Sequence, residues 1–165
     1  MLILIRGAGD IASGIGWRLV RSGFPVAMTD LEQPTAVRWK AAFCQAVWAG
    51  SCEVEGVAAR RCDTGEQARR ALAAGVIPVL PDPEGRAVAE LRPEVVVDAI
   101  LAKRNLGTQI ADAPLVIGVG PGFTAGADCH CVIETMRGHT LGRCLYEGSA
   151  LPNTGIPGNV GGYTV

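Results

Sequence analysis

Three small residues near the start of the chain have the spacing of a turn that binds phosphate groups. Gly7 and Gly9 follow a short apolar run, and Ala12 occupies the third position of the pattern G-x-G-x-x-[G/A]. In such a turn the first glycine permits a tight bend, the second lets a pyrophosphate approach the backbone, and the third small residue lets helix and strand pack closely. The start of the following helix supplies free N–H groups. This spacing predicts a bound dinucleotide or another nucleotide.

Two acidic residues bear on this prediction. Asp30 ends the next apolar run, about 20 residues downstream of the glycines. In dinucleotide-binding domains, a carboxylate at this position accepts hydrogen bonds from a ribose. A carboxylate there favours NAD over NADP, because it repels a 2′-phosphate. Asp10 sits at the helix start, where its own carboxylate could cap the first turn and compete for the anion position. The alternative is that the glycines provide only the geometry of a strand-to-helix turn.

A second glycine-rich stretch, "GVGPGFTAGADCH" (residues 118–130), follows a predicted core strand. Ligands bind at the carboxyl ends of strands in open α/β sheets, and successive N–H groups of a glycine loop can form an anion nest. The alternative is a permissive loop that links the sheet to a hairpin. The candidate ligand-binding residues are Gly7, Gly9, Asp10, Ala12 and Asp30 in the first part of the chain, and Gly120, Pro121, Gly122, Phe123, Thr124 and His130 in the second. No residue is assigned a catalytic role.

The six cysteines include no CxxC pair and are expected to be thiols. On a strand, Cys129 and Cys131 would share one face and His130 the other, so the three cannot hold one metal ion. We expect no metal site. If the chain turns at Arg137-Gly138, Cys131 falls opposite Cys144, which is compatible with two packed thiols or a redox-sensitive bridge.

The elements that must position these residues alternate between strand and helix. Strands are predicted over residues 2–5, 25–29, 76–80, 95–101 and 115–119, a short strand or hairpin over 53–61, and helices over 11–21, 35–48, 65–74 and 87–91. This alternation predicts an α/β domain with a Rossmann-like doubly wound, mostly parallel sheet. From Asp128 two strands about a tight turn predict a C-terminal β-hairpin extension. We expect residues 1–127 to form the Rossmann-like domain, and residues 128–165, the hairpin and a Gly/Pro-rich tail, to belong to the same compact unit.

The composition excludes several classes of protein. With 165 residues, 48% hydrophobic and 19% charged, the chain can bury the core of one domain. A net charge of −1 and a pI of about 6.1 give no general attraction to nucleic acid or to an anionic membrane. No apolar run has the length of a membrane span, and Arg6 and Asp10 interrupt the first apolar run before it reaches the length of a secretory signal. We expect a cytoplasmic protein.

Three stretches of the sequence together resemble one family. They are "IRGAGDIASGIGWRLVRSGFPVAMTDLEQPTAVRW", "GVGPGFTAGADCHCVIETMRGHTLGR" and "PNTGIPG". The family is that of the YqeB-type selenium-dependent molybdenum-hydroxylase accessory proteins, whose Rossmann portion is similar to the XdhC group. The resemblance implies an accessory or maturation factor for a molybdenum hydroxylase, with the hydroxylase apoenzyme as partner and a nucleotide or the pterin molybdenum cofactor as ligand. Longer members of the family continue past the "PNTGIPG" segment.

Two other classes of function remain compatible with the residues. An NAD-dependent oxidoreductase of unknown substrate is supported by Asp30, although the sequence shows no evident proton donor. A non-catalytic Rossmann-fold scaffold would use the glycine loops only for backbone geometry. Whether the chain catalyses a reaction, and whether it forms a homo-oligomer, are left open by the sequence.

Overall fold

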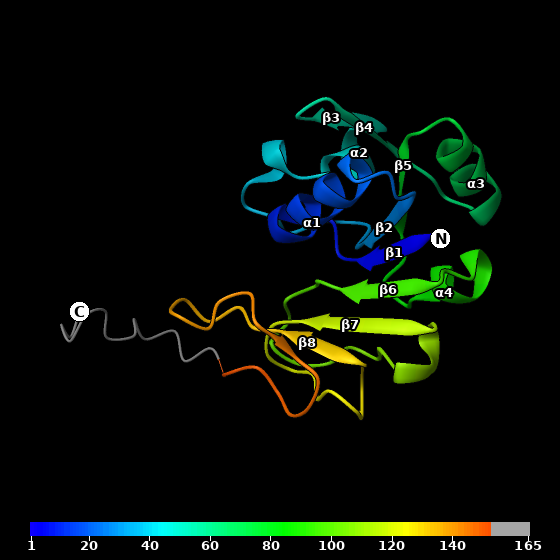
Figure 1. The fold of residues 1–165 in the computed structure, drawn as a ribbon. Coiled ribbons are helices and arrows are strands. Elements are labelled where there is room, and N and C mark those ends of the chain that lie inside the picture. Colours follow the sequence, from blue (N-terminus) through cyan, green and yellow to red (C-terminus); the bar gives the residue numbers. More distant parts are fainter. Residues whose placement is uncertain (153–165) are drawn as a thin grey trace.

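A nine-stranded sheet organises the computed structural model, which describes residues 1–152 (Figure 1). The strands are β1 (Ile3–Arg6), β2 (Val26–Asp30), β3 (Ser51–Val54), β4 (Val57–Arg61), β5 (Ile77–Pro81), β6 (Val95–Asp98), β7 (Leu115–Val119), β8 (Cys131–Ile133) and β9 (Cys144–Leu145). The helices are α1 (Asp10–Arg21), α2 (Gln45–Ala49), α3 (Gly65–Ala73) and α4 (Arg86–Leu91), with short 3₁₀ turns η1 (Trp39–Ala41) and η2 (Ile110–Asp112). The Rossmann-like α/β architecture predicted from the sequence is confirmed.

The strand order β3-β4-β5-β2-β1-β6-β7-β8-β9 places a switch point between β1 and β6. From β1 the chain builds the sheet outward through β2 on one side, and after β5 it returns to add β6 on the other side. All neighbouring strands run parallel except the edge pairs β3–β4 and β8–β9. In open α/β sheets, ligands bind outside the carboxyl ends of the strands at such a switch point.

Helices cover both faces of the sheet, which explains why the central strands are apolar along their whole length. Alternate residues of β1 enter different cores: Ile3 and Ile5 pack with α1 and α2, whereas Leu4 packs with α3 and α4. Within the described part of the chain, no helix is long and apolar enough to cross a membrane.

The predicted helix over residues 35–48 is wrong. Only η1 and α2 form there, and the backbone between them is extended at Ala42, with φ −134° and ψ 138°. The cause is tertiary hydrogen bonding: Phe43 N donates to Ser13 Oγ at 2.8 Å, and Cys44 N donates to the Ala8 carbonyl at 2.9 Å. These two amides hold the segment against the loop after β1, and a continuous helix would have used both.

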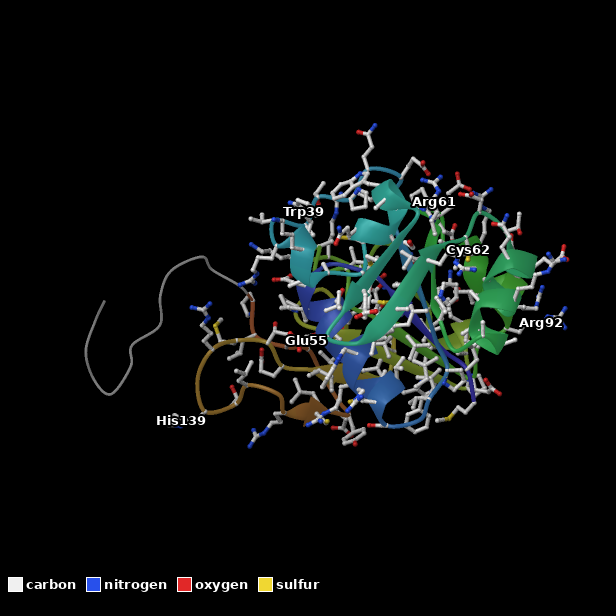
Figure 2. The ribbon with its side chains drawn as sticks, turned by 90° about the horizontal axis from the view of Figure 1, so that it is seen from above. Trp39, Glu55, Arg61, Cys62, Arg92 and His139 are labelled. Atoms are coloured by element: carbon white, nitrogen blue, oxygen red, sulfur yellow. The ribbon has the colours of Figure 1, made fainter. Side chains whose placement is uncertain are left out.

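The C-terminal hairpin is present, but its register differs from the prediction. Cys144 pairs with Ile133, and Cys131 lies one diagonal step away, so the predicted pairing of Cys131 directly opposite Cys144 is wrong. The connection is longer than a two-residue turn, because Glu134 N donates to the Arg143 carbonyl and closes a loop over the intervening residues. Both cysteines are free thiols. His139 is exposed in this loop (Figure 2).

The strand β8 is also more than part of a hairpin. It pairs in parallel with β7, with Ile117 opposite Cys131 and Val119 opposite Ile133. The nine strands therefore form one continuous sheet, with β8 and β9 at the edge opposite to β3 and β4 (Figure 1). The predicted Gly/Pro-rich tail lies outside the described residues from position 153 onward.

Candidate functional site

A cavity of about 330 Å³ lies at the switch point of the sheet, and we call it the switch-point cavity. Its walls come from the loop after β1, the start of α1, and the carboxyl ends of β2, β5 and β6. The lining residues are Arg6, Gly7, Gly9, Asp10, Ile11, Ala12, Thr29, Asp30, Leu31, Thr35, Ala36, Asp82, Pro83, Ala99, Ile100, Leu101 and Leu106. Its volume is at the lower end of the range of about 300–1,000 Å³ for small-molecule sites.

The first predicted loop forms one wall of this cavity. Gly7 has φ +102°, and a Cβ there would lie 2.9 Å from the Ala99 carbonyl oxygen, so only glycine fits this tight turn. Gly9 is the N-cap residue of α1. Ser13, buried in the first turns of the helix, donates its hydroxyl hydrogen to the Ala8 carbonyl at 3.0 Å and fixes the loop from below.

Asp30 lies above this loop and is tied to it. Its Oδ2 accepts a hydrogen bond from Ala8 N at 2.9 Å, and its Oδ1 accepts one from Leu31 N at 2.8 Å. Burial raises the pKa of Asp30, while the hydrogen bonds from Leu31 and Ala8 act in the opposite direction. Each carboxylate oxygen keeps a second acceptor position, so Asp30 is positioned to accept hydrogen bonds from ligand hydroxyl groups as well.

The start of α1 keeps unused donors. Within residues 1–152, the backbone N–H groups of Gly9, Asp10 and Ala12 have no protein acceptor. These three residues line the cavity. The arrangement matches the expected anion position at the amino end of a helix.

Asp10 is the first residue of α1, and its carboxylate accepts a backbone hydrogen bond within the first turn. Its Oδ1 accepts a hydrogen bond from Ile11 N at 3.1 Å, which removes one donor from the anion position. Its other oxygen forms an ion pair with Arg38, whose Nε lies 2.6 Å away. The guanidinium group of Arg38 therefore offsets the negative charge that would otherwise repel a phosphate at this helix end.

The second predicted loop does not line the cavity. Gly120 has φ +83°, and a Cβ there would lie 2.8 Å from Thr135 Oγ1. Gly122 has φ +114°, and a Cβ there would lie 2.7 Å from the backbone of Arg104. The segment after β6 thus lies between this loop and the first one. Gly120 and Gly122 therefore stand where the chain packs closely, as the permissive-loop alternative expects.

The other candidate residues of the second loop also have contacts within the protein. Phe123 is 4% exposed and packs in the core beside α3 and α4. Thr124 N donates to Asp128 Oδ2 at 2.8 Å, and its hydroxyl lies 3.0 Å from that of Ser149. Neither these residues nor Pro121 is among the residues that line the cavity.

His130 lies at the far end of the sheet from the cavity. Its Nδ1 accepts a hydrogen bond from Val116 N at 3.0 Å, and its own backbone N donates to the Val116 carbonyl at 2.8 Å. Because β8 runs parallel to β7, the residue just before β8 meets the beginning of β7, and that is the amino-terminal edge of the sheet. The imidazole completes the hydrogen bonding of this edge.

Sequence reasoning did not identify Arg6 and Thr108, which form a buried polar cluster with Asp98 beside the cavity. Arg6 and Asp98 end the neighbouring strands β1 and β6 in register, 5% and 1% exposed, with Arg6 Nη1 3.7 Å from Asp98 Oδ2. The buried hydroxyl of Thr108 donates to Asp98 Oδ2 at 2.6 Å and accepts a hydrogen bond from Arg6. The sequence signal that could have indicated this cluster is Arg6, an arginine at the end of an all-aliphatic strand and directly before Gly7.

No group of three or more His, Cys, Asp or Glu side chains in the described part of the chain could hold a metal ion.

Comparison with known proteins gives one informative match. No family model matches the chain, and no solved structure matches it. A protein of Escherichia coli (strain K12) named "Uncharacterized protein YqeB" is 54% identical over 163 residues, which is 99% of this chain and 30% of that protein. The chain therefore spans about 30% of the length of this curated relative. The resemblance inferred from the sequence is confirmed at the level of that name: over almost its whole length, the chain is similar to YqeB.

Proposed function

We propose that this domain binds a nucleotide, or the pterin-phosphate of the molybdenum cofactor, in the switch-point cavity. The proposal depends on two features that line the same cavity. One is the Asp30 carboxylate, which is hydrogen-bonded to the first loop, and the other is the set of three backbone N–H groups without a protein acceptor at the start of α1. The carboxylate suits the hydroxyl groups of a sugar, and the amides suit a phosphate.

The size and charge of the cavity limit the ligand. A volume of about 330 Å³ suits one nucleotide or pterin unit, so the second half of a dinucleotide would extend over the cavity mouth. Among dinucleotides, NAD fits better than NADP, because the Asp30 carboxylate repels a 2′-phosphate at the ribose.

We further propose that the domain acts as an accessory factor in the maturation of a selenium-dependent molybdenum hydroxylase, with the apoenzyme as its partner. The support is the similarity to YqeB together with the sequence resemblance to the YqeB-type accessory proteins, including the XdhC-like Rossmann portion. In this role the cavity would hold the cofactor, or a nucleotide used in handling it, before transfer to the hydroxylase.

Calorimetric titration and thermal unfolding with NAD, NADP, CTP and molybdopterin test the binding proposal. We expect at least one of them to bind, and the substitution Asp30→Asn to weaken its binding, because an amide cannot accept hydrogen bonds on both of its heteroatoms. Asp63→Asn is the matched control, since Asp63 is an exposed carboxylate paired with Arg61 away from the cavity. Absence of binding by all four compounds would contradict the proposal.

An NAD-dependent oxidoreductase would use the same cavity, and the position of Asp30 at the end of β2 favours it as the second candidate. Its test is hydride transfer to or from added NAD(H), followed by absorbance at the reduced nicotinamide band. Binding without any hydride transfer across a panel of hydroxy acids and aldehydes would favour the accessory role instead. Co-purification of a hydroxylase subunit with no bound small molecule would favour a scaffold.

A further inference from the structure

We propose that the floor of the switch-point cavity recognises the carbonyl group of a lactam or carboxamide on the ligand, through Arg6 and Thr29. This inference rests on the proposed nucleotide site and specifies the part of the ligand that lies away from the sugar and phosphate. It concerns the heterocycle, whereas Asp30 and the start of α1 concern the ribose and phosphate.

The two residues lie side by side at the ends of neighbouring strands. Arg6 ends β1, Thr29 lies near the end of β2, and the two are register partners in the parallel pair. Each follows a residue of the α3 and α4 core by two positions, namely Leu4 and Ala27, so both side chains lie on the same face of the sheet. Both residues line the cavity, although Arg6 is only 5% and Thr29 only 3% exposed.

Each of these side chains has a polar atom that the protein leaves open. Arg6 donates through its Nη atoms to Thr108 and to the Leu106 carbonyl, whereas no described residue accepts from its Nε and none bonds the Thr29 hydroxyl. In the same described region, no polar side-chain atom that is fully shielded lacks a hydrogen-bond partner. The Arg6 Nε and the Thr29 hydroxyl are therefore not fully shielded, and because both residues line the cavity, we infer that both atoms face its open space.

The charges around the floor favour a neutral acceptor over an anion. Asp98 lies 3.7 Å from Arg6 and offsets its charge. Two more carboxylates line the cavity: Asp30 and Asp82, the second held by the backbone N–H of Ala87 at 2.7 Å. A carboxylate or phosphate placed here would be repelled by these carboxylates.

A lactam offers the complementary hydrogen bonds. Its carbonyl oxygen accepts from Arg6 Nε, and its adjacent N–H donates to the Thr29 hydroxyl, which can act as donor or acceptor. The nicotinamide carboxamide, the uracil-type pyrimidine lactam and the pterin lactam all have this chemistry. In an amino-substituted ring such as adenine the donor and acceptor positions of this edge are exchanged, so the exocyclic group meets the Arg6 donor with another donor, and leaving a charged buried donor unpaired weakens binding.

The matched ligands AMP and IMP test this recognition, because they share ribose and phosphate and differ in an amino group against a lactam. We expect calorimetry to show IMP binding about tenfold or more tightly than AMP, because only IMP offers the Arg6 guanidinium a carbonyl acceptor. Thr29→Val should reduce that preference, while Thr29→Ser, which keeps the hydroxyl, should retain it. Thermal unfolding of both variants verifies that they fold.

Equal binding of AMP and IMP would overturn this inference and leave the proposed nucleotide site intact. An IMP preference that survives unchanged in Thr29→Val would also overturn the part assigned to Thr29. Failure of both ligands to bind, together with failure of the nucleotides named above, would overturn the proposed function itself.

Discussion

The second glycine loop offers a sharp test of whether its glycines serve packing or ligand binding. Gly122 and Gly126 both have positive φ, +114° and +87°. A Cβ at Gly122 would lie 2.7 Å from the backbone of Arg104, whereas a Cβ at Gly126 would have no other atom within 4 Å. Replacing each by alanine therefore imposes a similar backbone cost at both positions and a steric cost at Gly122 alone.

The expected magnitudes follow from these two costs. A left-handed backbone costs an L-residue about 1–2 kcal/mol. Overpacking against atoms that cannot move aside costs about 1–3 kcal/mol more, and backbone atoms of Arg104 are of that kind. We expect Gly126→Ala to lower the free energy of unfolding by about 1–2 kcal/mol and Gly122→Ala by about 2–5 kcal/mol.

Urea denaturation followed by circular dichroism measures both variants against the original protein. With a slope of about 1–3 kcal/mol per M for a domain of this size, the two variants should differ in midpoint by on the order of 1 M. Equal destabilisation of the two would refute the close approach of Gly122 to Arg104. The reasoning that this loop is a packed connection would then fail, and an anion nest would regain support.

Three further outcomes follow from the structure. Gly14→Ala should raise the free energy of unfolding by about 0.5–1 kcal/mol in urea denaturation, because Gly14 lies inside α1 with no other atom within 4 Å of an added Cβ; a loss of stability would contradict this helix geometry. Iodoacetamide at about pH 8 should modify the exposed Cys144 before Cys44 in peptide mass mapping, since burial and the nearby Asp30 charge raise the pKa of Cys44 to about 11. Burial raises the pKa of Asp30. The free energy of unfolding of the original protein should therefore fall, relative to that of Asp30→Asn, as the pH rises from about 4 through the raised pKa. Parallel pH profiles for the two proteins would show that the pKa of Asp30 is not raised.

Much of the fold could be predicted because its signals are local. The strand over Leu115–Val119 is present with the predicted bounds. Of the short strand or hairpin predicted over residues 53–61, the hairpin is present, and Gly56, with φ +77°, lies in its turn between β3 and β4. The first glycine loop was also predicted correctly as a tight strand-to-helix turn, because Gly7 and Gly9 follow an aliphatic run and precede an amphipathic helix. In each case the residues that determine the geometry are adjacent in sequence.

The features that could not be predicted depend on contacts between distant segments. The segment over residues 35–48 has the composition of a helix. However, the backbone N–H groups of Phe43 and Cys44 donate hydrogen bonds to Ser13 and Ala8 and not within a helix. The register of β8 and β9 depends on the length of the loop between them, which no single turn motif indicated.

The candidate site shows the same division. The residues near the first loop line the cavity, whereas glycines needed for close packing in the second loop have the same sequence pattern as glycines that bind an anion. Arg6, Thr29 and Asp98 belong to no motif, and only the alignment of β1, β2 and β6 brings them together.

The most direct test of the central claim is a titration of isotopically labelled protein with NAD, NADP, CTP and molybdopterin, followed through the backbone amide resonances. The account predicts that the amide signals of Gly9, Asp10 and Ala12 shift in a saturable manner for at least one ligand, together with that of Leu31 next to the Asp30 carboxylate. Saturable shifts confined to residues outside the switch-point cavity, or no shifts with any of the four compounds, would contradict it.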